Sequence, residues 1–227
     1  MFRLMKLKPP HGWRAAWWEF SIVTLGVLLA LGAEQTIRGI QAERELGAVR
    51  QALNNEARRN LTAVHFREQL KPCIDRRLGE LRKVLERHKE RQPLGITAPI
   101  GTPTYWAEST GTWQIALSGE ALGNMPLEEK LAYSDAFDTY QAFTRLRDDE
   151  NVHWRTISLL DEARLLGDED WPTLHRAFGE ARAINNRFTA MNEYILKSAT
   201  LGEPVEPLNL RPAVAEGLRQ FCQPMIG

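Results

Sequence analysis

The stretch that decides the fold is residues 15–33, which read AAWWEFSIVTLGVLLALGA. It is the only long apolar segment of the sequence, and Glu19 is its one charged residue. A helix that spans a bilayer needs about 20 mostly apolar residues. Residues 15–33 therefore predict a transmembrane helix, and Trp17 and Trp18 stand at its start, where interfacial aromatic residues are common.

A cleaved signal peptide is the alternative interpretation of this segment. The uncharged run 20–33 has the length of a signal-peptide core, and Ala30, Gly32 and Ala33 are the small residues typical of a cleavage site. The carboxylate of Glu19 is unusual for a signal peptide, and the tryptophans suit an interface. Both features favour a retained anchor.

The flanking charges predict the orientation. Residues 1–14 contain four Lys and Arg and no acidic residue, whereas both signs of charge follow residue 33. Lys and Arg are enriched on the cytoplasmic side of membrane helices. We therefore expect a cytoplasmic tail over 1–14, a transmembrane helix over 15–33 and a periplasmic domain over 34–227, in a bacterial inner membrane.

One face of the expected membrane helix differs from the others. Steps of three and four residues place Glu19, Val23, Gly26, Ala30 and Ala33 on one stripe. Gly26 and Ala30 form a small-xxx-small pair, which allows another helix to approach closely, and a charge in a membrane helix usually faces protein or water. The stripe predicts a docking surface for a membrane-protein partner or a second copy. A hydrated Glu19 near the helix N-terminus is the alternative.

A family resemblance is carried by the order of residues in this segment: Trp18-Glu19-Phe20, then Ile22-Val23, then Gly26-Val27-Leu28-Leu29-Ala30-Leu31, followed by a polar helix. This order resembles the N-terminal segment of uncharacterised bacterial single-pass membrane proteins, over about 20 of the 227 residues. The resemblance implies an anchored, extracytoplasmic helical domain, and it implies no activity.

Composition and motifs exclude several functions. The 29 acidic and 29 basic residues balance, so nothing electrostatic favours nucleic acid. No nucleotide-binding, hydrolase or Glu-x-x-His motif is present, so we expect neither an enzyme nor a cofactor. Asp149 and His153 are one helical turn apart, but a lone pair binds metal weakly, and we expect no metal site.

The two cysteines, Cys73 and Cys222, predict a disulfide in an oxidising compartment. The bond would tie the C-terminal segment to the first long helix. Two free, buried thiols are the alternative.

Residues 34–227 predict an all-α fold, an elongated antiparallel helical bundle with short connections, because apolar residues recur at helical steps and no strand-length alternation occurs. The expected elements begin with helices over 34–70 and 74–88, with a kink at Pro72, and a loop over 92–103. A short helix, or two short turns, then starts at Thr102 or Thr104 and ends at Gly119 or Gly123. The last elements are a helix from an Asn124 N-cap to 166 with a solvated bend over 145–151, and helices over 171–201 and 212–222.

Four tryptophans of the body, Trp106, Trp113, Trp154 and Trp171, either line a ligand pocket or pack in the core. The anchor and the helical body together predict a membrane-anchored accessory or scaffolding subunit. A sensor-like ligand-binding domain is the alternative. We rank it second because only 14 residues precede the span and no output segment follows the body.

Overall fold

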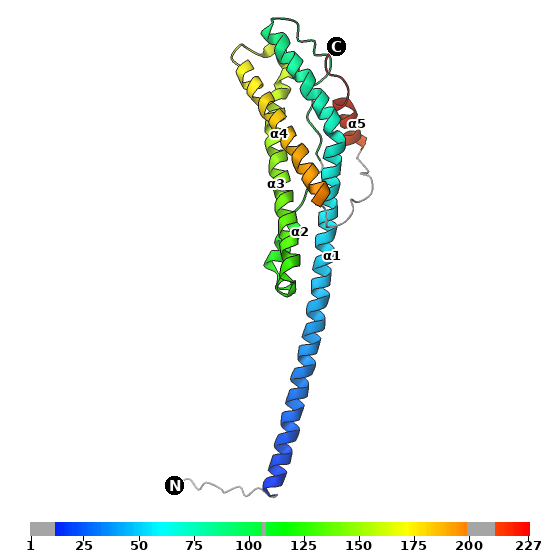
Figure 1. The fold of residues 1–227 in the computed structure, drawn as a ribbon, viewed down its shortest axis with the longest axis vertical. Coiled ribbons are helices and arrows are strands. Elements are labelled where there is room, and N and C mark those ends of the chain that lie inside the picture. Colours follow the sequence, from blue (N-terminus) through cyan, green and yellow to red (C-terminus); the bar gives the residue numbers. More distant parts are fainter. Residues whose placement is uncertain (1–11, 106–107, 199–211) are drawn as a thin grey trace, which may run out of the picture. The chain divides into compact units, whose positions relative to one another are not determined.

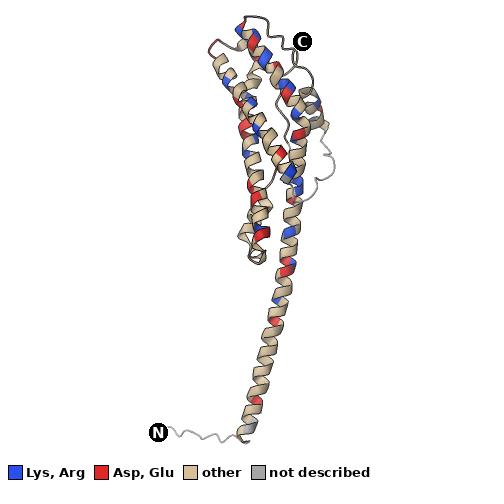
Figure 2. Ribbon diagram, viewed as in Figure 1, with Lys and Arg blue, Asp and Glu red and all other residues tan. Residues whose placement is uncertain are grey.

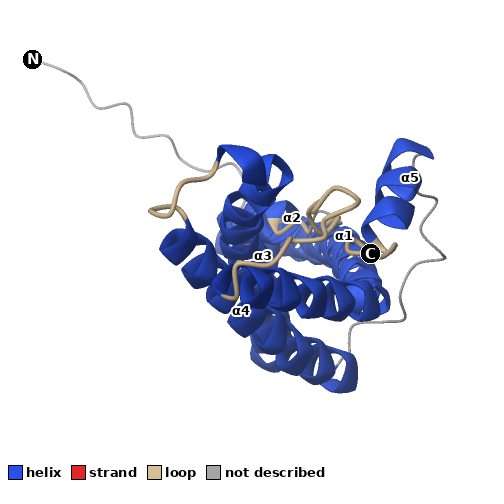
Figure 3. Cartoon of the chain, turned by 90° about the horizontal axis from the view of Figure 1, so that it is seen from above, coloured by secondary structure: helices blue, strands red, loops and turns tan. Residues whose placement is uncertain are grey.

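The structure, a computed structural model, describes residues 12–105, 108–198 and 212–227. Helices make up the regular secondary structure of these residues, and Figure 3 shows no strand among them. The prediction of an all-α fold is confirmed. The elements (Figure 1) are α1 (Trp13–Lys89), α2 (Gly111–Ser118), the 3-10 helix η1 (Ala121–Asn124), α3 (Leu127–Ile157), the 3-10 helix η2 (Ser158–Leu165), α4 (Trp171–Ser198) and α5 (Pro212–Phe221).

Internal contacts divide the chain into two compact units, Met1–Val49 and Arg50–Gly227, and α1 contributes to both. In the first unit the apolar part of α1 is exposed along its length, with no buried residue in its most apolar window. Figure 2 shows few charged residues there. By length and composition this one helix can cross a membrane. A helix suits that environment because its backbone hydrogen bonds are satisfied internally.

Helix α1 passes through Pro72 without ending. Proline lacks an N–H group and its ring crowds the preceding turn, so a helix that contains it bends. Figure 1 shows α1 changing direction within its cyan-to-green part. The two helical runs expected on either side of Pro72 therefore form one bent helix.

Hydrogen bonds and one ring stack show the directions of the three long helices of the second unit. Along α1 and α3 both partner numbers rise together, in the pairs Arg50–Glu129, Asn54–Tyr133, Ala57–Tyr140 and Arg67–Glu150, so these helices are parallel. Along α1 and α4 one number rises as the other falls, in the pairs His88–Trp171, Asp75–Asn185 and Glu68–Asn192, so these helices are antiparallel. Helices α3 and α4 follow each other in sequence and are antiparallel, as expected of a bundle.

The parallel pair exists because the chain returns along α1 before α3 begins. We call residues 90–105 the return segment. Its contacts step down α1 as its numbers rise: Arg87 donates to the carbonyl of Leu94, and Arg77 donates to the carbonyl of Pro99. Beyond it, Ser109 exchanges two hydrogen bonds with the side chain of Asn60. The proline- and glycine-rich loop expected over 92–103 thus runs alongside α1.

The core of the second unit is apolar and closely packed. Trp154 is fully buried, and Phe221 of α5 packs edge-on against it with ring centroids 5.8 Å apart. Helix α5 lies beside α1 in both Figure 1 and Figure 3. One continuous cluster includes Phe66, Leu70, Ile74, Leu81, Trp154, Ile157, Trp171, Leu174, Ala181, Phe221 and Met225.

Two local predictions are wrong. Asn124 does not cap a helix: it ends η1, and the N-cap of α3 is Pro126, which has no side-chain cap hydrogen bond. Residues 145–151 do not form a solvated bend, because they lie within the continuous helix α3 and Glu150 is completely buried.

We predict that Gly95→Ala lowers the free energy of unfolding by about 1–2 kcal/mol. Gly95 has φ +70°, which L residues rarely adopt, and a Cβ there would lie 2.0 Å from Nη1 of Arg87. Gly179→Ala is the matched control, because Gly179 lies within α4 with open space around it. Alanine there should raise the free energy of unfolding by about 0.5–1 kcal/mol. Chemical denaturation of both variants provides the comparison, and equal effects would contradict the role of Gly95.

Candidate functional site

The stripe predicted to dock another helix lies on an exposed part of α1. Glu19, Val23, Gly26, Ala30 and Ala33 are all exposed. A Cβ at Gly26 would meet no atom within 4 Å outside its own helix backbone. Glu19 makes no hydrogen bond or ion pair within the described part of the chain. Within the first unit, no other described segment covers the stripe.

Aromatic residues form a separate face at the start of the apolar segment. Trp13 and Trp17 pack edge to face with ring centroids 6.3 Å apart, and Trp17 and Phe20 do so at 6.1 Å. Nearby, the hydroxyl of Ser21 donates to the carbonyl of Trp17 at 2.8 Å, so this polar group is satisfied within the helix. Aromatic rings at one end and an internally bonded hydroxyl both suit a helix end at a membrane interface.

The tryptophans of the body are used in packing. Trp113 is buried and stacks on Phe137 with centroids 5.6 Å apart. Trp154 and Trp171 belong to the main core cluster, and Trp171 stacks on His88 at 3.4 Å. Trp106 lies outside the described residues. The structure thus places Trp113 away from Trp154 and Trp171, and all three contribute apolar area to the bundle.

A buried ion pair that sequence analysis missed lies in the middle of the bundle. Nη2 of Arg67 lies 2.9 Å from Oε1 of Glu150, and the side chains are 3% and 0% exposed. The guanidinium also donates to Oδ1 of Asn185 at 3.0 Å and stands 4.4 Å from the ring centroid of Phe188. The hydroxyl of Tyr105 donates to the other carboxylate oxygen of Glu150 at 2.7 Å. Burial and the negative charge of Glu150 raise the pKa of Tyr105 well above its ordinary value.

A signal for this pair was present in the sequence. Glu150 stands between Leu146 and Trp154 at helical steps of four, so it occupies a position of the apolar stripe of α3. Arg67 likewise stands between two buried apolar residues of α1 at helical steps of three, Val64 before it and Leu70 after it. Opposite charges at core positions of two helices indicate a buried pair, whereas the average polarity of 145–151 suggested solvent exposure.

Two further carboxylates hold the chain around α2. Glu56 of α1 accepts the backbone N–H groups of Thr112 at 3.1 Å and Trp113 at 3.2 Å, so it caps the N-terminus of α2 across the fold. Glu108, just before α2, pairs with Arg147 of α3. Burial raises the pKa of Glu108 above its ordinary value, and the guanidinium of Arg147 acts in the opposite direction.

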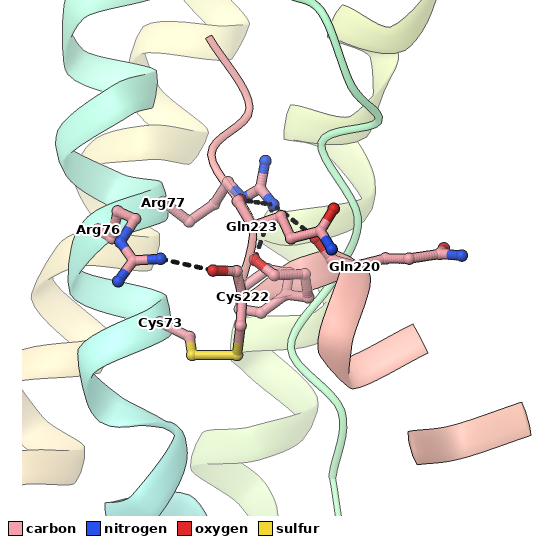
Figure 4. Close-up of a disulfide and its surroundings, with 7 residues drawn as sticks. Cys73, Arg76, Arg77, Gln220, Cys222 and Gln223 are labelled. Carbon is pink, nitrogen blue, oxygen red and sulfur yellow. Dashed lines mark hydrogen bonds between the residues drawn. A yellow bond between two sulfur atoms is a disulfide. The ribbon is translucent and has the colours of Figure 1, made fainter. Parts of the chain in front are cut away.

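The predicted disulfide is confirmed. Cys73 of α1 and Cys222, the residue after α5, are joined by an S–S bond with Cα atoms 4.8 Å apart (Figure 4). The adjacent Arg76 donates to the carbonyl of Cys222 at 2.5 Å, as Figure 4 also shows. The end of α5 is therefore fixed to α1 by a covalent bond and by hydrogen bonds.

Arg77 completes this attachment from inside. Its side chain is 1% exposed and donates to the carbonyls of Phe221 at 2.7 Å and Gln223 at 3.2 Å. Desolvation lowers the pKa of Arg77, but a guanidinium stays charged in proteins. A cation at the last carbonyls of α5 is favourable because those carbonyls lack helix partners. Glu80 accepts the N–H of Met225 at 3.0 Å, which holds the residues beyond α5.

Known proteins give no guide to the chemistry of these sites. Comparisons with protein-family models, curated proteins and solved structures found no match for this chain. The resemblance to bacterial single-pass membrane proteins stays a prediction. Within the described ranges, no group of three or more His, Cys, Asp and Glu side chains is placed to hold a metal ion.

We predict that Arg67→Met lowers the free energy of unfolding by about 3–5 kcal/mol, because Glu150 is left buried without its cation. Denaturation followed by tryptophan fluorescence measures the change. The double variant Arg67→Met with Glu150→Gln removes both charges and keeps an acceptor for Tyr105. It should recover most of the loss, and a double variant that is less stable than either single variant would contradict the ion-pair explanation.

We predict that replacing Cys73 and Cys222 together by serine destabilises the second unit. The bond closes a loop with a sequence separation of 149 residues, and the chain-entropy model gives on the order of 4–5 kcal/mol for such a loop, often less in practice. Denaturation of the variant against the native chain measures the effect. Peptide mapping without reductant should yield the cross-linked pair. Two free thiols in protein from the native compartment would refute the bond.

Proposed function

We propose that this chain is a membrane-anchored accessory or scaffolding protein without catalytic activity, whose apolar helix binds another membrane helix. The observation that carries the proposal is the exposed stripe. It places an unpaired carboxylate at Glu19 and open space at Gly26 on one apolar helix. In a bilayer a charged side chain is costly unless it meets protein or water. A second helix, from a membrane protein or from another copy, would supply both a polar partner and close packing.

The location belongs to the same proposal. The basic residues of 1–14 support a cytoplasmic N-terminus. The Cys73–Cys222 bond supports an oxidising compartment for the helical body, because disulfides persist there and are rare in the cytosol. Together these features support a body in the periplasm of a bacterial cell. Glu19 and the tryptophans at the start of the apolar segment favour a retained single-pass anchor over a cleaved signal peptide.

The accessory role is preferred to the sensor-like role for one reason. A sensor based on the tryptophans would need them to line a cavity, whereas Trp113, Trp154 and Trp171 are buried against other side chains. The body is then a rigid helical domain that positions surfaces for a partner.

We predict that Glu19→Leu and Gly26→Leu each reduce recovery of the membrane partner at least fivefold. The first removes the polar group and the second fills the space that a neighbouring helix needs. The measurement is in-cell crosslinking of the full chain followed by a pull-down in mild detergent. Ser21→Leu is the control, because Ser21 lies on the opposite side of α1 and only bonds its own helix.

The expected result also requires an intact body, which formation of the Cys73–Cys222 bond reports. Unchanged recovery with both stripe variants would refute docking through this face. Recovery of the native chain alone, as a monomer, would refute the accessory role itself.

A further inference from the structure

A groove of about 370 Å³ lies between the return segment and α5. One wall consists of residues from 98–104, and the other consists of Gly217, Gln220, Phe221 and Gln223. Its volume falls within the range of about 300–1,000 Å³ that is usual for small-molecule sites. It lies wholly within the second unit, and no residue of the apolar segment 15–33 lines it.

Both walls of the groove are held in place. The guanidinium of Arg77 lies behind them and donates to the carbonyl of Pro99 at 3.3 Å on one side and to those of Gln220 and Gln223 on the other. The disulfide at Cys222 attaches the α5 wall to α1. A site whose walls are fixed before binding requires little ordering when a ligand enters.

The lining is uncharged and rich in hydrogen-bonding groups. None of the lining residues carries a charge. Within the described residues, the side chains of Thr102, Thr104 and Gln223 have no hydrogen-bond partner of their own. Figure 4 shows the side chain of Gln223 on the far side of the backbone from Arg76. Amides and hydroxyls both donate and accept, which suits a ligand made of hydroxyl groups.

The wall of the return segment is poorly suited to a peptide that adds as a strand. The N–H groups of Thr97 and Ala98 already donate to the carbonyl of Met225 at 2.8 and 3.3 Å. The N–H of Ile100 donates to Oδ1 of Asp161 at 2.7 Å. Because main-chain hydrogen bonds provide the affinity in strand addition, these three N–H groups are not available to a peptide strand.

Gly217 supplies space on the α5 wall. It lies inside a helix, where alanine would be more stable by about 1 kcal/mol, and a Cβ there would meet no atom within 4 Å. Neither backbone conformation nor packing therefore requires glycine at this position. A larger side chain at 217 would occupy the groove instead of clashing with the fold.

We propose that this groove binds a neutral saccharide, with the hydroxyls of Thr102 and Thr104 and the amide of Gln223 bonding its hydroxyl groups and Pro99 contacting its apolar ring face. This site goes beyond the accessory role and is independent of the docking stripe. Through this groove the helical body would bind a saccharide in the compartment in which the body lies.

The test is calorimetric titration of the full chain in lipid nanodiscs, which avoid detergents with sugar headgroups. The probes are the tetramer of N-acetylglucosamine and maltotetraose. At least one should bind saturably to the native chain. Gly217→Leu and Gln223→Ala should each weaken that binding at least tenfold. Gly179→Leu is the matched control, because Gly179 is also an open position inside a helix but does not line the groove. The affinity of this variant for the saccharide should equal that of the native chain.

Thermal melting and formation of the disulfide show that each variant is folded. Absence of saturable binding by either saccharide would overturn the proposal, as would equal binding by the native chain and a folded Gly217→Leu variant. Binding of acetyl-trialanine amide without binding of either saccharide would also overturn it and would assign the groove to peptides. None of these results bears on recovery of a membrane partner, so the two proposals fail separately.

Discussion

Burying an arginine and a glutamate in a helical bundle is costly unless the two charges pair and gain further hydrogen bonds. Arg67 of α1 and Glu150 of α3 pair with each other and gain partners on two other elements, Asn185 of α4 and Tyr105 of the return segment. Nη1 of Arg67 has no hydrogen-bond partner among the described residues, so the pair depends on all four elements being in place. We therefore expect it to select one register of α3 against α1, since a shift of one turn would bury both charges unpaired.

The C-terminal end of the fold also depends on a buried guanidinium that needs hydrogen-bond acceptors. Here the acceptors are backbone carbonyl groups instead of a carboxylate. Helix α5 is short, and its last carbonyls have no partner within the helix. Arg77 supplies the donors, and Glu80 takes the N–H of Met225. The Cys73–Cys222 bond then adds a covalent link at the same place. Buried charge thus holds both the centre and the end of the bundle, whereas apolar contacts fill the space between them.

Features with a strong local pattern were predictable from the sequence. The apolar run 15–33 and the regular apolar steps of α4 both depend on residues close in the chain, and the disulfide followed from the two cysteines. The failures arose where distant partners decide the outcome. Glu150 is buried because Arg67 is present 83 residues earlier. The direction of the return segment depends on Arg77 and Asn60 of α1, which no local pattern reveals.

The parallel pairing of α1 with α3 has a consequence for synthesis on the ribosome. The residues of α1 that contact α3 precede their partners by 79–83 positions, so the apolar face of α1 is made long before anything can cover it. The hairpin of α3 and α4 has far more local contacts and should form readily once both helices emerge. We expect α1 to pack onto a preformed hairpin of α3 and α4, and the disulfide at Cys222 to form last. Incorrect packing of the exposed apolar face of α1 is therefore a risk mainly while the chain is still being synthesised.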